Sequence, residues 1–337
     1  MIDFPSAIEV VRTGRDLSAD QTGALIDQML DGTAQSDEVK TLLVAIRKKG
    51  ESIDELVGAA RSMRRHMTPI THRYPVLLDT CGTGGSGSGT FNISTTAAIV
   101  AAACGVAVAK HGNRKATSRT GSADVLVELG VGIEGDAAQV EKTLDSVGLC
   151  FCFAAKLHPA MRHVVEIRRS LNVPTLFNLL GPLCNPAGAT HQLLGTTTPA
   201  TQAKMAAALA QLGTARSAVI RGTDGQDEVT LDGATEIIEI NGNELTTHRW
   251  TGETFGLPAV TAAQCQATDP AHSAKIIRDV LAGKKGPCRD IVIASAAAAL
   301  WLVGKSESLV QAAAAATAAI DSGAAANKLN QLVTVTR

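Results

Sequence analysis

The sequence predicts an α/β protein in which a mostly parallel central sheet carries helices on both faces. Three observations predict this fold. The first seventy residues carry helical patterns only, short apolar segments alternate with helical ones from Pro75 onward, and residues 236–240 turn through Asn241-Gly242 into a second strand. Alternating strands and helices are typical of a parallel sheet covered on both sides, and the Asn-Gly turn adds an antiparallel hairpin.

The N-terminal helices are predicted from capping residues and apolar spacing. Ser18 and Gln21 fit a capping box in front of an apolar stripe that runs to Leu30. A second stripe stops at Gly50, a residue placed to end a helix, and Ser52 opens a third helix. The N-terminal part of the chain is therefore expected to form a helical layer.

The remaining elements are assigned from the same kinds of pattern. Strands are expected at residues 76–78, 106–110, 219–221, 236–240 and 244–249, and Cys150 and Cys152 would alternate on a further strand. Helices are expected at residues 97–103, 122–129, 137–147 and 199–213. Asp290 is expected to cap a long apolar helix, and the alanine-rich run after Leu309 is expected to form another.

Composition and charge exclude several classes of protein. The 337 residues are enough for two domains and a full core. With 31 Lys and Arg against 32 Asp and Glu, no broad field attracts nucleic acid or an anionic membrane. The N-terminus lacks a signal-peptide pattern, and the most apolar stretch, residues 291–303, is shorter than a membrane span. Seven cysteines without a CxxC pair argue against a disulfide framework and a zinc site, so a cytoplasmic protein is expected.

A glycine-rich loop is the most informative feature of the chain. Five glycines lie within residues 82–89, directly after the apolar run 76–78 and Asp79, and residues 90–96 lead into a helix. Glycines let backbone N–H groups approach an anion closely, and a helix N-terminus adds its dipole. A flexible surface loop would have a similar composition, but the adjoining strand and helix favour a phosphate site. The loop lacks the Gly-Lys-Ser/Thr of a P-loop and matches GxGxxG poorly.

A second polar segment follows the next expected strand. Residues 110–114 read Lys-His-Gly-Asn-Arg, and a second group of polar residues follows at 117–124. Ligands bind beyond the carboxyl ends of parallel strands, so this segment and the glycine loop are expected to face one crevice. Lys110 would supply a charge for a phosphate, and the Ser118 and Ser122 hydroxyls would supply donors. Taken alone, the segment could also be a solvated turn.

Two further segments carry polar residues of interest. Asp227 and Glu228 end an acidic turn at 224–228, and adjacent carboxylates suit Mg²⁺, which often bridges a protein to substrate phosphates. An acidic surface turn is the alternative, and the neighbouring phosphate site favours the metal. Arg168 lies on a short helix expected between two apolar segments. Its guanidinium could grip a carboxylate as a planar fork, or it could simply be solvated.

Several motifs in fixed order resemble those of the anthranilate phosphoribosyltransferases, a tryptophan-pathway family within the nucleoside phosphorylase-like phosphoribosyltransferases. The likeness runs from about Leu17 to Leu332 and so covers nearly the whole chain. The matching motifs are Gly82-Thr83-Gly84-Gly85, Asn92-Ile93-Ser94-Thr95, Lys110-His111-Gly112-Asn113-Arg114, Gly121-Ser122-Ala123-Asp124-Val125-Leu126, His158-Pro159-Ala160-Met161, Gly181-Pro182-Leu183-Cys184-Asn185-Pro186 and Asp227-Glu228.

The resemblance implies a domain organisation, a reaction and partners. A small all-helical domain would comprise residues 1–72, completed by helices at about 160–182, and residues 73–159 and 183–337 would form the α/β domain that binds phosphoribosyl pyrophosphate. The chain would form a homodimer through its helical domains. It would transfer the phosphoribosyl group from phosphoribosyl pyrophosphate to the amine of anthranilate and release pyrophosphate, with two Mg²⁺ at each site.

The resemblance also implies roles for individual residues. Asp227 and Glu228 would hold one Mg²⁺, and Ser94 would touch the other. Asn113 and Arg168 would bind anthranilate, with Arg168 on its carboxylate and Gly82 against the molecule. His111 lies where a polar partner for anthranilate is expected, and no role as a base is assigned to it. Phosphoribosyl pyrophosphate would be held by Gly82, Gly85, Ser86, Thr90, Asn92, Ser94, Thr95, Lys110, Ser118 and Ser122.

Two positions depart from the pattern of the family. Ser86 stands where an aspartate usually follows the double glycine. Serine keeps a hydrogen-bond donor but loses a charge that would help to organise the metal-bound pyrophosphate. Leu157 stands where the family often has an aromatic residue, which would loosen the anthranilate side of the site.

Two other functions stay open on the sequence alone. A pyrimidine nucleoside phosphorylase shares the fold type and splits a ribosyl bond with inorganic phosphate, but the run at 110–114 and the Asp227-Glu228 pair argue against it. A catalytically silent relative that binds nucleic acid is the other alternative. The balanced charge and the phosphate-site residues argue against that function.

Overall fold

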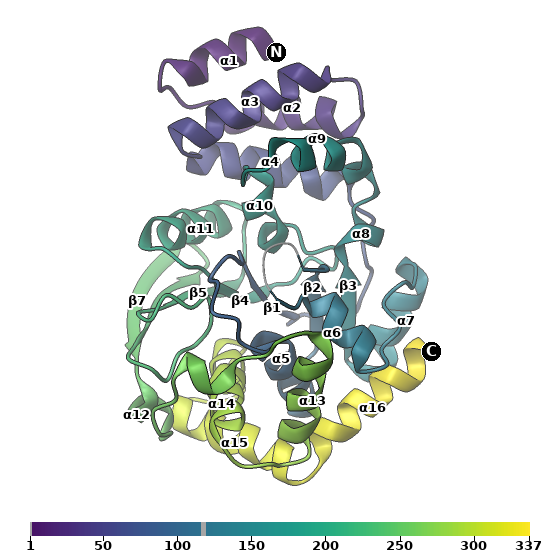
Figure 1. Ribbon diagram of the computed structural model, residues 1–337, viewed down its shortest axis with the longest axis vertical. Coiled ribbons are helices and arrows are strands. Elements are labelled where there is room, and N and C mark those ends of the chain that lie inside the picture. The colour runs from purple at the N-terminus through teal and green to yellow at the C-terminus, as the bar shows by residue number, and fades with distance from the viewer. Residues whose placement is uncertain (1, 116–118) are drawn as a thin grey trace.

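A computed structural model describes residues 2–115 and 119–337. Its centre is a seven-stranded sheet in the order β3-β2-β1-β4-β5-β6-β7 (Figure 1). The strands β3, β2, β1, β4 and β5 run parallel, and β6 and β7 form an antiparallel hairpin at one edge. The predicted α/β class with a mostly parallel sheet is confirmed. The strands are β1 (Leu78–Gly82), β2 (Val108–Gly112), β3 (Leu149–Phe153), β4 (His191–Gly195), β5 (Arg216–Gly222), β6 (Thr235–Asn241) and β7 (Glu244–Trp250).

The strand boundaries differ from the expected ones in the parallel part of the sheet. β1 begins at Leu78, where the predicted strand ended, and β2 begins two residues later than expected. Asp79 and Thr80 lie buried inside β1, as Lys110 and His111 do inside β2. A search for apolar runs misses strands that bury polar side chains. It missed β4 as well.

The helix that follows β1, together with helices from the C-terminal part of the chain, covers one face of the sheet (Figure 1). They share a core with Leu193, Ala218 and Ile220 of the central strands. The helices of this layer are α5 (Ile93–Ala103), α13 (Pro270–Leu281), α14 (Pro287–Leu302), α15 (Leu309–Asp321) and α16 (Ala324–Thr336). Around the sheet lie α6 (Ser122–Glu128), α7 (Ala137–Val147), α8 (Ala154–Leu157) and α12 (Gly252–Phe255).

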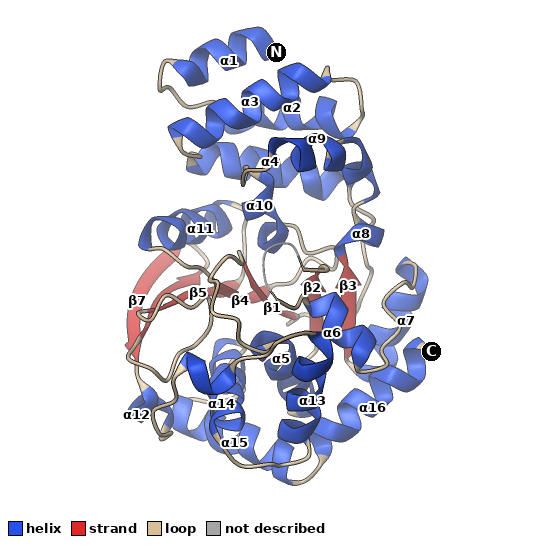
Figure 2. Cartoon of the chain, viewed as in Figure 1, coloured by secondary structure: helices blue, strands red, loops and turns tan. Residues whose placement is uncertain are grey.

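The N-terminal helices lie beyond the other face of the sheet (Figure 2). Leu194 and Val219, next to the residues of the first core along the same strands, belong to a second core that includes α11 (Pro199–Gln211) and the N-terminal helices. Alternation along a strand therefore divides the molecule into two apolar layers. The N-terminal layer contains α1 (Phe4–Arg12), α2 (Ala19–Leu30), α3 (Ser36–Lys49), α4 (Ile53–His66), α9 (Val165–Leu171) and α10 (Phe177–Leu180).

The helix-capping predictions are confirmed near the N-terminus and wrong for one helix near the C-terminus. The capping box of Ser18 with Gln21 is confirmed, and Gly50 ends α3 as expected. The prediction that Asp290 caps the long apolar helix is wrong. Gly286 is the cap of α14 and Pro287 its first residue, so Asp290 lies inside the first turn. Proline at a first helical position has a fixed φ suited to the helix and no N–H to satisfy.

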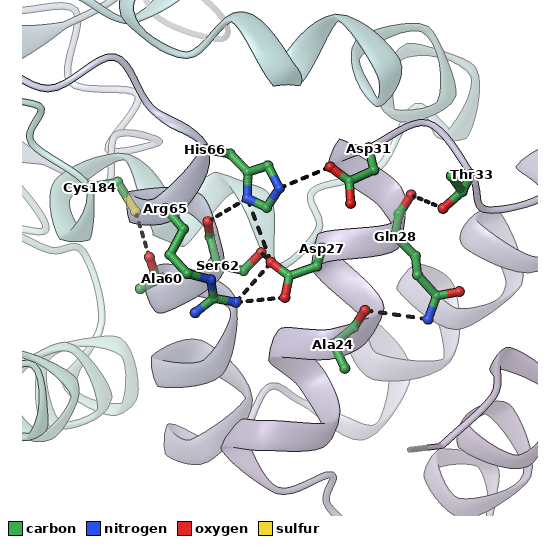
Figure 3. A network of polar contacts seen from close by, with 10 residues as sticks. All are labelled: Ala24, Asp27, Gln28, Asp31, Thr33, Ala60, Ser62, Arg65, His66 and Cys184. Atoms are coloured by element: carbon green, nitrogen blue, oxygen red, sulfur yellow. Dashed lines mark hydrogen bonds and ion pairs between the residues drawn. The ribbon is translucent and has the colours of Figure 1, made fainter.

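A polar cluster joins α2 to α4 within the helical layer (Figure 3). The carboxylate of Asp27 accepts hydrogen bonds from Ser62 Oγ at 2.6 Å and from Arg65 at 2.6 and 2.8 Å. His66 reaches Asp31 at 3.2 Å with its Nε2. These contacts fix how the two helices lie against each other along their polar side.

None of the helices described is by itself long and apolar enough to cross a membrane. The bent pair α15 and α16 passes that test only when the two helices are taken together, and by length and composition only.

Two glycines set the close approach of α2 and α4. A Cβ on Gly58 would lie 2.1 Å from the Ala19 carbonyl oxygen, whereas a Cβ on Gly23 would lie 3.4 Å from the Gly58 carbonyl oxygen. Gly58→Ala therefore forces the helices apart, and we expect a loss of about 1 to 3 kcal/mol in the free energy of unfolding. Thermal unfolding followed by circular dichroism measures it.

The matched control is Gly23→Ala, which gains the same helix propensity and meets only an ordinary contact. Equal stability of the two variants would contradict the steric explanation.

Candidate active site

The glycine loop joins the end of β1 to the start of α5, as expected. Gly84 and Gly85 have φ of +68° and +86°, a region that residues with a side chain rarely adopt. A Cβ at either position would meet nothing within 4 Å. The backbone conformation, rather than crowding, therefore requires glycine here, and it leaves the loop open to a ligand.

The acidic turn after β5 lies against the glycine loop and the start of α5. The Ser94 backbone N–H donates to Glu228 Oε1 at 3.2 Å, and a Cβ on Gly82 would lie 3.0 Å from Asp227 Oδ2. A Cβ on Gly195, at the end of β4, would lie 1.8 Å from the Asp227 carbonyl oxygen. Gly195 is a residue of this region that the sequence analysis missed. A lone glycine at the end of a strand gives little signal, because the carbonyl that it accommodates is distant in sequence.

Lys110 points from β2 into the same region. Its ammonium group donates to the Thr80 carbonyl and lies 3.4 Å from Ser94 Oγ. Burial lowers the pKa of Lys110, and the nearby carboxylates of Asp79 and Glu228 act in the opposite direction. The lysine thus contributes a positive charge at the N-terminus of α5, where the glycine loop ends.

Asp79 in β1 is a buried carboxylate that the sequence analysis assigned no role. It accepts a hydrogen bond from the His111 backbone N–H at 3.0 Å. Burial raises the pKa of Asp79, and the charge of Lys110 opposes that rise. Within the described part of the chain, its Oδ2 has no hydrogen-bond partner. The sequence gives one signal for such a residue, because Asp79 directly follows the apolar run 76–78. A charge buried there without a partner would be costly.

Asp227 and Glu228 are adjacent carboxylates in a confined space. Although part of residue Glu228 is exposed, its carboxyl group is closely surrounded. Burial raises the pKa of Glu228 to about 8, the charge of Asp227 adds to the rise, and Lys110 opposes it. Without a cation, Glu228 therefore holds a proton at neutral pH.

Asn92 precedes α5 and is held by two hydroxyls. Its Oδ1 accepts hydrogen bonds from Thr120 Oγ1 and, at 2.9 Å, from Ser273 Oγ. Ser273, fully buried on α13, also accepts a bond from the Asn92 backbone N–H at 3.1 Å. Because both hydroxyls bind the side-chain oxygen, the Asn92 amide directs its NH₂ group away from them. The sequence analysis assigned no role to Thr120 or Ser273.

Hydroxyl groups line the loop itself. Ser88 Oγ lies 3.2 Å from Ser86 Oγ and 3.1 Å from Thr90 Oγ1. At the first turn of α5, the buried Thr95 Oγ1 has no hydrogen-bond partner among the described residues. Hydroxyls, glycine N–H groups, a lysine and a helix N-terminus together form an arrangement that suits phosphate groups.

The side chain of His111 points away from Lys110, because the two residues are neighbours on β2. His111 Nδ1 lies 2.9 Å from the Gly181 carbonyl oxygen, and its Nε2 lies 3.2 Å from His158 Nε2. Burial lowers the pKa of His111 to about 4 and that of His158 to about 3. Both rings are therefore neutral at physiological pH.

The remaining predicted residues lie at the edges of this region. Ser122 Oγ donates to the Asn113 carbonyl at 3.4 Å. Arg168 lies on α9 with its guanidinium 5.4 Å from the centre of the Phe177 ring, and burial lowers its pKa. Among the described residues, no hydrogen bond or ring contact links Arg168 to the glycine loop; Arg168 contacts Phe177, and His111 contacts Gly181 four residues further along the chain. Ser118 lies outside the described residues.

The acidic pair fits a metal that is shared with a substrate. In the described part of the chain, no cluster of three or more His, Cys, Asp or Glu residues could hold a metal ion. Asp227 and Glu228 thus offer two carboxylates but no complete cage. Mg²⁺ is usually held by one or two carboxylates together with substrate phosphates and water, so the residues present suit this ion.

Comparisons with known proteins agree with this arrangement. Residues 74–326 match the glycosyl transferase family, a/b domain, and residues 5–67 match the glycosyl transferase family, helical bundle domain. The chain belongs to this family. It is 62% identical over 331 residues to an anthranilate phosphoribosyltransferase of Rhodopirellula baltica, covering 98% of this chain and 97% of that protein. An anthranilate phosphoribosyltransferase of Moorella thermoacetica is 46% identical over 326 residues, covering 97% of this chain and 96% of the other.

Solved structures show the same fold. The anthranilate phosphoribosyltransferase of Thermus thermophilus superposes with a TM-score of 0.92 at 39% identity, covering 98% of this chain and 99% of that one. The Saccharomyces cerevisiae enzyme in complex with PRPP and Mg superposes with a TM-score of 0.91 at 27% identity, covering 99% and 97%. The resemblance identified in the sequence is confirmed, and these relatives favour a phosphoribosyltransferase over a nucleoside phosphorylase or a nucleic-acid-binding protein.

The raised pKa of Glu228 makes the stability of the metal-free protein depend on pH. The folded protein holds a proton that the unfolded chain releases near pH 4.5, so stability falls as pH rises from about 4.5 to about 8. Glu228→Gln removes this loss. We expect the variant to be more stable than the original at pH 8 by a few kcal/mol and similar to it at pH 5.

Thermal unfolding in EDTA across this pH range measures the difference. Glu9→Gln changes an exposed glutamate and is the control. If the difference in stability between the original protein and Glu228→Gln does not increase with pH, the pKa of the Glu228 carboxyl is not raised.

Proposed function

We infer that this chain transfers the phosphoribosyl group from phosphoribosyl pyrophosphate to the amine of anthranilate, giving N-(5-phosphoribosyl)anthranilate and pyrophosphate in tryptophan biosynthesis. The observation that carries this proposal is the contact of Ser94 with Glu228, which joins the glycine loop and α5 to the acidic turn. Lys110 lies beside both. A site of this kind presents cationic and N–H groups to a diphosphate and carboxylates to its metal.

We propose that the glycine loop and the start of α5 bind phosphoribosyl pyrophosphate. The open glycine backbone, the hydroxyl chain from Ser86 to Thr90 and the NH₂ group of Asn92 support this assignment. Lys110 adds charge from β2. The proposed contacts are Gly82, Gly85, Ser86, Thr90, Asn92, Ser94, Thr95, Lys110, Ser118 and Ser122.

Magnesium fits the same site, and relatives of this chain have been solved with it. We propose two ions at each site, one held by Asp227 and Glu228 and one touched by Ser94. When bound, Mg²⁺ neutralises charge that develops on the departing pyrophosphate. The proton on Glu228 leaves when its carboxylate binds a cation, because a nearby positive charge favours the ionised form.

The reaction places charge where these residues can stabilise it. Breaking the bond from the anomeric carbon leaves negative charge on pyrophosphate, and Lys110 and the loop N–H groups stabilise that charge. The aromatic amine of anthranilate is a weak base and is neutral at pH 7, so it needs positioning more than deprotonation. His111 is not suited to proton removal, since both of its ring nitrogens already face partners.

We propose that anthranilate binds between the glycine loop and α9, near Gly82, His111, Asn113 and Arg168. Arg168 is half-buried, and burial disfavours its charge. A carboxylate ligand would compensate for that loss as a bidentate partner. Phe177 lies beneath the guanidinium and holds its plane in place.

The domain division, the oligomeric state and the cellular location of the chain are also proposals. We propose a helical domain of residues 1–72 with helices from about 160–182, and an α/β domain of residues 73–159 and 183–337. The shared core of α1 to α4 with α9 and α10 supports grouping these helices together, and the same core also includes α11 and residues of the sheet. We propose a homodimer through the helical domains. A cytoplasmic location is proposed because all seven cysteines are free.

One assay tests the function. Purified protein is mixed with Mg²⁺, phosphoribosyl pyrophosphate and anthranilate, and the loss of anthranilate fluorescence is followed. We expect turnover that requires all three. A magnesium titration of Asp227→Asn should show a higher half-saturating concentration, because the variant loses a carboxylate ligand.

Phosphorolysis of uridine or thymidine without anthranilate turnover would instead favour a nucleoside phosphorylase. An unchanged magnesium requirement in Asp227→Asn would remove the acidic pair from the metal site.

Ser273 offers a separate test of the phosphate site. Ser273→Ala removes a hydrogen bond that orients Asn92, so the amide no longer presents its NH₂ group reliably. We expect the KM for phosphoribosyl pyrophosphate to rise roughly fivefold, equivalent to ~1 kcal/mol for one hydrogen bond. Steady-state kinetics with each substrate varied in turn measure this.

The matched control is Ser295→Ala, because Ser295 is a buried serine on α14 whose hydroxyl has no partner among the described residues. A rise in KM shared by both variants, or one confined to anthranilate, would count against the role of Ser273 in positioning Asn92.

A further inference from the structure

Two cysteines meet beside the glycine loop but outside the site described above. Cys265 ends a short 3₁₀ helix, η3 (Ala262–Cys265), and Cys288 is the second residue of α14. The side chains of the two cysteines interact, and Cys288 Sγ lies 3.6 Å from the carbonyl oxygen of Gln264, the residue before Cys265. Both sulfurs are free thiols.

The two thiols differ in exposure and acidity. Cys265 is 2% exposed, whereas Cys288 is partly exposed. The hydrogen bond from Cys265 lowers the pKa of Cys288, and Lys284 lowers it further. Cys288 also lies in the first turn of α14, where its own backbone N–H and the helix dipole favour a thiolate. Burial raises the pKa of the other two partly exposed cysteines, Cys81 and Cys104.

A small molecule can reach Cys288 from solvent. The residue lines a hollow of about 160 Å³ together with Lys284, Lys285 and Arg289. Lys284 pairs with Asp279, and Lys285 and Arg289 pair with Asp321. The thiol is thus accessible from solvent and has basic side chains among its neighbours, as redox-sensitive cysteines do.

Cys265 belongs to the segment that holds the glycine loop. The Phe91 backbone N–H donates to the Cys265 carbonyl at 2.9 Å, and the Ala267 N–H donates to the Gly89 carbonyl at 2.9 Å. Residues 89–91, which directly precede α5, are therefore fixed to residues 265–267 on both sides. A shift of Cys265 must shift the end of the loop.

We propose that Cys265 and Cys288 form a reversible disulfide that weakens the binding of phosphoribosyl pyrophosphate. This inference rests on the proposed function for its effect on activity. The disulfide itself depends only on the two thiols, their contact and the access of an oxidant to Cys288.

The oxidant is hydrogen peroxide. The Cys288 thiolate attacks one peroxide oxygen, the O–O bond breaks, and the leaving hydroxide takes a proton to become water. Cys288 is then a sulfenic acid. The Cys265 sulfur attacks the Cys288 sulfur and gives up its proton, the S–O bond breaks, and a second water leaves. The pair of sulfurs loses two electrons and the peroxide gains them. A small thiol reverses the bond by exchange.

The new bond moves η3 rather than α14. A disulfide brings the two sulfurs to about 2.05 Å, well inside a hydrogen-bonded contact. Residues 291–300 of α14 are all buried in the core, whereas Gln264 and Gln266 beside Cys265 are exposed. The lightly packed segment therefore yields, and residues 89–91 of the loop move with it.

The experiment exposes the full-length protein to hydrogen peroxide and maps its cysteines by mass spectrometry. We expect a cross-linked peptide pair containing Cys265 and Cys288, reversed by dithiothreitol. Cys265→Ala should stop at a sulfenic acid on Cys288 that dimedone labels. Cys104→Ser, a change at another partly exposed cysteine, should leave the cross-link intact.

Oxidation of Cys104 before Cys288, or absence of the cross-link, would overturn the proposed disulfide. These measurements do not use the enzymatic reaction, so they stand apart from the proposed function. Thermal unfolding of each reduced variant verifies that it is folded.

The effect on the site is measured by kinetics before and after oxidation. We expect a several-fold rise in the KM for phosphoribosyl pyrophosphate, restored by dithiothreitol and absent in Cys288→Ser. Unchanged kinetics in a fully cross-linked protein would overturn the regulatory effect. Inactivity of the reduced protein would instead refute the proposed function and leave the disulfide result intact.

Discussion

A buried lysine surrounded by carboxylates is the feature on which the candidate site depends. Lys110 on β2 interacts with Asp79 on the adjacent β1 and with Glu228, which follows β5. Lys110 and Asp79 would each be costly to bury as a lone charge and compensate one another in part, and Glu228 adds to this compensation when it is ionised. Their meeting requires the strand order β2-β1-β4-β5, because it brings the carboxyl ends of strands distant in sequence to one edge. The strand order of the fold therefore determines the electrostatics of the site.

One strand serves both sides of the site. Because successive residues of β2 point to opposite faces, Lys110 reaches the glycine loop while His111 reaches Gly181 and His158. The His111 contact ties the sheet to the segment that leads on from α9 and α10. The phosphate part and the helical part of the molecule therefore share a rigid support, and a displacement of β2 would disturb both.

Much of the site could be predicted from local patterns, and the rest depends on contacts across the chain. The glycine loop, Lys110 and the Asp227-Glu228 pair were predictable because their polar residues lie at the ends of apolar strand segments or shortly after them. Gly195 and Ser273 were not, since their importance lies in contacts with Asp227 and Asn92, far away in sequence. Asp290 failed as a cap for a local reason, because Gly286 and Pro287 already begin the helix.

Ser86 shows how a departure from the family can be accommodated. Its hydroxyl joins a chain with Ser88 and Thr90, so it contributes neutral donors where an aspartate would add a negative charge. The carboxylates proposed to bind a metal are then those of the acidic turn. Glu228 must release its proton before it contributes a full negative charge. A loop without the aspartate is also less repulsive to a diphosphate. In the proposed site, the substitution would therefore shift the balance from holding the metal toward holding the phosphate groups, and a metal that arrives already bound to its diphosphate would suit that balance best.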